Sequence, residues 1–191
     1  MTPNETRSRW RAVRIAAAIV VAAGAIGAAM VYLGVYNVAA DVPHTRPVFW
    51  LLETARDRAV DVRARAVRVP PDLVDTTRIV DGAGLYDDMC ASCHLAPGME
   101  KTEISQGLYP RAPELARRSD RTPAEEFWII KHGLKMTGMA AWGKTHSDTL
   151  IWDMVAFLQK LPTLSPDQYT ALVKSAPEDH DDMMKAQKPA R

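Results

Sequence analysis

A chain of 191 residues, of which 47% are hydrophobic and 25% charged, has room for one compact domain and additional segments. Its 24 Lys and Arg residues nearly balance 23 Asp and Glu residues, so the formal net charge of +1 excludes a general attraction to nucleic acid. The chain has only two cysteines, Cys90 and Cys93, which are too close in sequence to staple a long loop. The cysteines therefore indicate a binding site.

Residues 1–40 predict a transmembrane anchor. Arginines precede an uncharged apolar stretch from Ile15 to Tyr36, and about 20 apolar residues suffice to span a bilayer. Because basic flanks stay in the cytoplasm, we expect the rest of the chain on the periplasmic side of a bacterial inner membrane. A cleaved signal peptide is the alternative, since small residues precede Asp41, but such peptides have a shorter apolar region.

Residues 41–75 predict an amphipathic segment bounded by prolines, with a helix between residues 48 and 69. Apolar side chains recur in it at helical spacing. These apolar residues are Leu51, Leu52, Ala55, Ala59, Val62 and Ala66. Charged residues occupy much of the remaining circumference, so the segment is either a spacer, a helix packed on the next domain or on the bilayer, or a docking element for a partner.

Residues 76–163 have the composition of a compact helical domain, without the alternation that is typical of strands. The expected order is helix, long loop with Gly and Pro, helix, Gly-rich loop and helix. Residues 164–191 form a polar tail that we predict to be disordered. His180, Met183 and Met184 lie there among carboxylates, a mixture that would also suit copper(I). The expected fold class is all-α.

The run from Cys90 to His94 reads Cys-Ala-Ser-Cys-His, which is the attachment pattern of c-type haem. Each thiol can add to a haem vinyl group, and the adjacent imidazole would lie under the iron. A zinc site would need further ligands at unusual spacing, and a redox dithiol belongs in a βαβ context that this chain lacks. We predict one covalent haem c on Cys90 and Cys93, with His94 as an iron ligand.

The sequence from residue 81 to 161 resembles class I cytochromes c. The resemblance rests on Gly82 and Tyr86 before the first cysteine, and on Met154 and Phe157 in a helix expected from Ser147 to Leu161. It implies that the first and last helices of the domain cross closely, with Gly82 allowing the approach. A more detailed resemblance, to proteobacterial membrane-bound single-haem cytochromes, extends to Leu85-Tyr86, Lys131-His132-Gly133 and residues 139–143.

The resemblance also implies a methionine as the second iron ligand, from a loop over the distal haem face. Met136 and Met139 both lie in this loop, and the family pattern favours Met139, although Ala140 stands where the family usually has proline. The second ring nitrogen of His94 is expected to bond a proline carbonyl, with Pro113 as the first choice and Pro110 as the second.

An iron held by both His94 and Met139 has no open coordination position, so we expect one-electron transfer and not catalysis. The chain would serve as a respiratory carrier or as the cytochrome subunit of a redox complex. Its expected partners are the membrane and redox proteins, namely a dehydrogenase, a quinol-oxidising complex or a terminal oxidase, and not nucleic acid. A haem enzyme or gas sensor with a labile sixth ligand remains the alternative.

Overall fold

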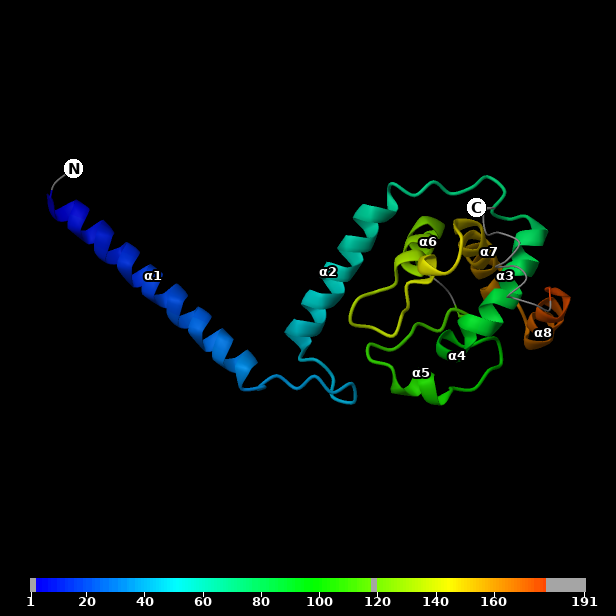
Figure 1. Ribbon diagram of the computed structural model, residues 1–191, viewed down its shortest axis with the longest axis horizontal. Helices are drawn as coiled ribbons and strands as arrows, with labels where there is room; N and C mark the ends of the chain where they lie inside the picture. Colours follow the sequence, from blue (N-terminus) through cyan, green and yellow to red (C-terminus); the bar gives the residue numbers. More distant parts are fainter. Residues whose placement is uncertain (1–2, 118–119, 178–191) are drawn as a thin grey trace. The chain divides into compact units, whose positions relative to one another are not determined.

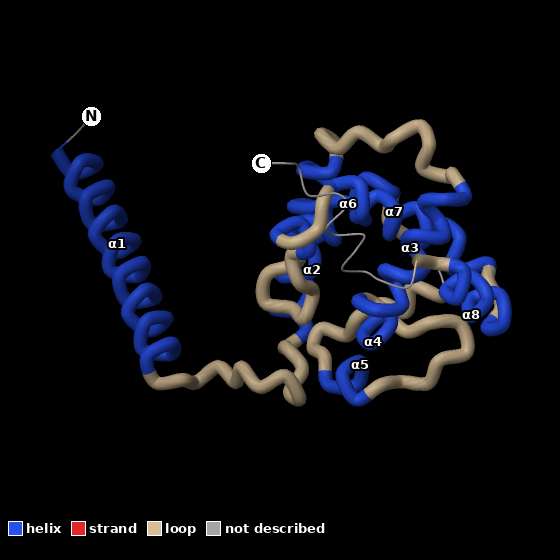
Figure 2. The backbone as a smooth tube through the Cα atoms, turned by 45° about the vertical axis from the view of Figure 1, so that its right-hand side comes forward, coloured by secondary structure: helices blue, strands red, loops and turns tan. Residues whose placement is uncertain are grey.

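A computed structural model describes residues 3–117 and 120–177 of the chain. Every regular element within these residues is a helix, and Figure 2 shows helices joined by loops with no strand among them. The chain divides into two compact units, residues 1–42 and residues 43–191. The predicted all-α fold is confirmed for the described part of the chain.

The first unit contains helix α1 (Pro3–Tyr32), drawn in blue in Figure 1. Its stretch Thr6–Tyr32 is 27 residues long, with a mean hydropathy of 2.2 in its most apolar window, and is long and apolar enough to cross a membrane. The helix ends earlier than the predicted Tyr36, because Gly34 adopts a φ of +62° and the Val35 N–H bonds back to the Met30 carbonyl. This left-handed glycine cap is a common way to end a helix.

Helix α2 (Arg46–Ala64) opens the second unit and packs on helix α6 (Pro123–His132). Of its side chains, Val60 and Ala64 are buried. The apolar face predicted for this segment is not the buried one, since Leu51, Leu52 and Val62 are all exposed. The helix contacts the domain through Val60, Ala64 and charged residues, so the position of α2 also depends on polar partners that its own hydrophobic pattern does not reveal.

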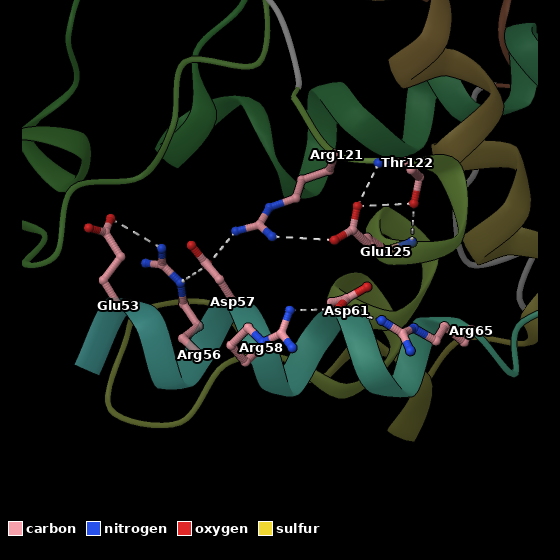
Figure 3. A network of polar contacts seen from close by, with 9 residues as sticks. All are labelled: Glu53, Arg56, Asp57, Arg58, Asp61, Arg65, Arg121, Thr122 and Glu125. Carbon is pink, nitrogen blue, oxygen red and sulfur yellow. Dashed lines mark hydrogen bonds and ion pairs between the residues drawn. The ribbon is translucent and has the colours of Figure 1, made fainter. Parts of the chain in front are cut away.

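Charged side chains join α2 to the start of α6, as Figure 3 shows. The Asp57 carboxylate accepts hydrogen bonds from Arg56 Nε at 2.8 Å and from Arg121, which also pairs with Glu125 at 3.4 Å. Burial alone would raise the pKa of Asp57, but the hydrogen bonds and charges of the two arginines outweigh it and lower that pKa. Asp57 is therefore an ionised link between α2 and the domain.

The core of the second unit is the contact between helix α3 (Thr76–Met89) and helix α7 (Asp148–Lys160). A Cβ atom added to Gly82 would lie 1.9 Å from the backbone oxygen of Asp153, so only glycine permits this approach. One turn further along α3, the rings of Tyr86 and Phe157 are 5.3 Å apart. The close contact that the family resemblance implies for Gly82 is confirmed.

Shorter elements complete the domain around these helices. They are α4 (Ala91–His94), α5 (Glu103–Gly107), and the 3-10 turns η1 (Trp142–Lys144) and η2 (Leu161–Thr163). The apolar run of α6 contributes to the core through Phe127, which stacks on Trp152 of α7 with the ring centroids 4.2 Å apart. The core thus unites α3, α6 and α7, and the segments that connect these helices carry the site described below.

The disorder predicted for residues 164–191 is wrong for the part that the structure describes, because Pro166–Ser175 forms helix α8 on the surface of α3. Ser165 and Gln168 form a reciprocal capping box at its start. The buried ring of Tyr169 faces Tyr86, and its hydroxyl donates a hydrogen bond to the Asp87 carboxylate at 2.6 Å.

The remaining tail residues of interest, His180, Met183 and Met184, lie outside the described residues, so copper binding by the tail stays a hypothesis.

Replacing Gly82 by Ala should destabilise the domain by about 1–3 kcal/mol, because the added methyl group collides with the backbone of α7. Gly107→Ala is the matched control, since nothing lies within 4 Å of a Cβ at that position. Thermal unfolding of both variants in detergent would test this. Equal unfolding temperatures for Gly82→Ala and the control would contradict the close approach of α3 and α7.

Candidate functional site

A helical turn positions the two thiols and the imidazole of the Cys90–His94 run. Cys90 ends α3 and precedes α4, and its carbonyl accepts hydrogen bonds from the N–H groups of Cys93 and His94, at 3.1 and 2.8 Å. The turn ends at Leu95, which has a φ of +61°, and the buried Tyr86 hydroxyl donates to the Leu95 carbonyl. The positions of Cys90, Cys93 and His94 are therefore set by the end of α3.

Both cysteines are free thiols, so no disulfide joins them. Burial, and secondarily the neighbouring Cys93, raises the pKa of Cys90 to about 12, which keeps this thiol protonated. Within the described residues no group of three or more His, Cys, Asp and Glu side chains is arranged to hold a metal ion. The zinc alternative for this motif therefore has no support from the described part of the chain.

His94 is held in one orientation by the chain segment that follows. Its Nδ1 atom lies 2.9 Å from the Pro113 carbonyl oxygen, and the Leu115 N–H donates to the His94 carbonyl at 3.3 Å. A carbonyl can only accept, so Nδ1 carries the proton and Nε2 keeps its lone pair for a metal. Burial lowers the pKa of His94 and favours this neutral imidazole. The predicted choice of Pro113 over Pro110 is confirmed.

The loop after α6 brings one of its two methionines to the core and exposes the other. Met139 is half-buried and packs against the hydrophobic core, whereas Met136 is 89% exposed and has a left-handed φ of +58°. The loop closes at its base, because the Leu134 N–H donates to the Met139 carbonyl at 3.2 Å. A Cβ at Gly133 would lie 2.7 Å from the same carbonyl oxygen, so this closure also requires a glycine.

Thr137 supports the Met139 backbone from within the loop. Its hydroxyl accepts the Met139 N–H at 3.1 Å and donates to the Leu134 carbonyl at 2.8 Å. Sequence reasoning missed this residue, although a threonine two positions before a turn residue is a known source of such bonds. The loop therefore has an internal constraint that offsets the absence of a proline at Ala140.

The residues present fit a covalently attached haem. Two free thiols and one imidazole share a helical turn, the Nε2 lone pair of that imidazole remains available, and a partly buried thioether lies on the loop after α6. Thiols can form thioether bonds to the macrocycle, while imidazole and thioether are ordinary axial ligands of haem iron. A helical domain that carries this set of groups is characteristic of single-haem cytochromes c.

Comparison with known families agrees with this class. Residues 77–158 match the family model described as Cytochrome C oxidase, cbb3-type, subunit III, and this stretch runs from the start of α3 into α7. The matched segment is a domain of the class I cytochrome c family, whose members carry covalently attached haem c and transfer electrons. A comparison with curated proteins gives no significant match.

Single replacements at the two cysteines test the attachment. Wild-type protein should retain one haem after acid extraction, whereas Cys90→Ala and Cys93→Ala should each lose one thioether, and the double variant should release all of its haem. The α band in alkaline pyridine measures the number of thioethers. Haem that is fully extractable from the wild type would contradict covalent attachment.

Proposed function

We propose that the chain is a membrane-anchored electron carrier whose single haem c is ligated by His94 and Met139. When bound, the haem supplies a one-electron Fe(III)/Fe(II) couple. The observation that supports this proposal most is the contrast between the two loop methionines, of which only Met139 packs against the core. The hydrogen bond from Nδ1 of His94 to the Pro113 carbonyl also supports the proposal, because it leaves the lone pair of Nε2 available to the iron.

Two protein ligands would leave no coordination position for a substrate, which favours electron transfer over catalysis. The Thr137 and Leu134 hydrogen bonds support a Met139 that stays in place and does not exchange readily. A haem enzyme or gas sensor would require the opposite, a loop that releases its ligand. The partly buried apolar side chains of Trp142 and Leu115 pack against the same core and would help to exclude water.

Replacing Met139 by Ala should abolish the ferric sulfur-to-iron charge-transfer band, make the haem at least partly high-spin and lower its reduction potential. Loss of an axial thioether removes the stabilisation of Fe(II), and axial ligands tune haem potentials over roughly 0.8 V. Met136→Ala is the matched control and should keep the band and the potential, with a stability change within about 0.5 kcal/mol, because this side chain is exposed.

The two variants also distinguish the alternatives. If Met136→Ala loses the band and Met139→Ala keeps it, Met136 is the ligand and the distal assignment is wrong. If neither variant changes the spectrum, the iron has no methionine ligand, and the haem enzyme or gas sensor becomes the preferred function. Binding of carbon monoxide by the wild type would also favour the haem enzyme or gas sensor.

For localisation we propose a single-pass protein of the bacterial inner membrane with its haem domain in the periplasm. Helix α1 meets the length and hydropathy needed for one span, and arginines cluster in its first turns. For partners we propose redox proteins of the same membrane, a dehydrogenase, a quinol-oxidising complex or a terminal oxidase. The oxidase subunit in the description of the matched family supports the last of these, with the chain as a carrier or a complex subunit.

A topology reporter tests the orientation. A reporter that is active only in the periplasm, fused after Asp75, should be active and should remain in the membrane fraction, because the basic N-terminal residues stay inside. A fusion after Thr6 is the matched control and should be inactive. An inactive fusion at Asp75 would reverse the topology, and a soluble protein starting at Asp41 would show a cleaved signal peptide instead of an anchor.

A further inference from the structure

Helix α2 has two faces of different character, and the haem domain covers only one of them. The covered face contains Val60 and Ala64, and the half-buried Asp57 beside them is bound by Arg121. At 100° per residue, Leu51 and Val62 lie roughly opposite this face. The domain therefore covers the side of α2 that carries Asp57, Val60 and Ala64, and it leaves Leu51 and Val62 outward.

The outward face is an apolar stripe that runs along most of the helix. Leu51 is 59% exposed, Leu52 44% and Val62 56%, and Ala55 between them is also exposed. Trp50 at the start of the helix is exposed as well, but at 100° per residue it lies on the side of Asp57 and does not belong to the stripe. Isolated exposed apolar residues are ordinary. A stripe of them along one helix face indicates instead a surface that binds a partner or a membrane.

The charges beside this stripe are mostly positive. Arg58 and Arg65 are exposed on its border, and both share a single carboxylate, that of Asp61, at 3.5 and 2.9 Å. Arg63 is exposed as well, and its guanidinium donates to the Ala59 carbonyl. An apolar stripe bordered by arginines matches the interface of an anionic bilayer, where the arginines meet lipid phosphates.

The chain connection keeps α2 close to a bilayer. Only residues 33–45 separate the end of α1 at Tyr32 from the start of α2 at Arg46. A fully extended segment of this length reaches on the order of 45 Å, so a membrane crossed by α1 stays within reach of α2. The stripe thus meets lipid at high effective concentration, and weak amphipathic affinity suffices for binding.

We infer that the outward face of α2, made of Leu51, Leu52, Ala55 and Val62, lies on the anionic surface of the membrane that α1 crosses. Because Asp57 and Arg121 fix α2 on the domain, this contact also sets the orientation of the haem domain relative to the bilayer. The inference rests on the proposed anchoring by α1 but not on the ligands of the haem.

Photo-crosslinking of the full-length, haem-loaded protein in its native membrane tests this surface. A diazirine-bearing amino acid at position 55 should give phospholipid adducts on irradiation, whereas the same probe at position 60 should give adducts within the domain, because Val60 is buried and α2 packs on α6. Introducing Leu51→Glu and Val62→Glu should lower the lipid adducts at position 55 about tenfold, since both new charges would enter the interface.

The matched control is Val74→Glu, which adds a charge at an apolar residue that is 75% exposed and lies outside α2; it should leave the lipid adducts unchanged. Adducts at position 55 mainly with another polypeptide would overturn the inference in favour of a partner protein or a second copy, and a lack of adducts would show a face open to water. Recovery in the membrane fraction and an unchanged haem spectrum show separately that the anchor and the haem site are intact.

Discussion

The close contact of α3 with α7 at Gly82 is the constraint on which the site depends. The absence of a side chain there lets the two backbones meet, and the Tyr86–Phe157 pair continues the contact toward the site. Arg78 reinforces the contact through a 2.7 Å ion pair with the buried Asp153. Because the site turn follows α3 without a break, any shift of this contact would move both thiols and the imidazole together.

The proposed axial ligands are positioned by backbone groups more than by side chains. The Pro113 carbonyl selects the tautomer of His94, and a hydrogen bond between the Leu134 and Met139 backbones closes the loop that carries Met139. Backbone hydrogen bonds leave little rotational freedom, which suits a carrier whose iron should change its charge without changing its ligands. Thr137 extends this arrangement to a loop that lacks the family's usual proline.

The segments outside the matched domain add contacts to it. Helix α2 adds a charged link through Asp57, and α8 covers α3 with Tyr169, so a helix on each side of the matched segment packs on the domain. The polar attachment of α2 leaves its apolar side for another surface, which allows one helix to serve two neighbours. If α2 binds the membrane surface, it orients the domain relative to the bilayer, and it does so without contacting the site.

The sequence alone determined the features that depend on local chemistry. The spacing of Cys90, Cys93 and His94 indicated covalent haem, the apolar length of α1 suited a membrane anchor better than a signal peptide, and the family resemblance gave Gly82 its role in a close helix contact. Tertiary structure decided the rest: which face of α2 is covered, that α8 folds, and which methionine packs against the core. These outcomes depend on partners distant in sequence, such as Arg121 and Asp87, and hydrophobic periodicity carries no information about where such partners lie.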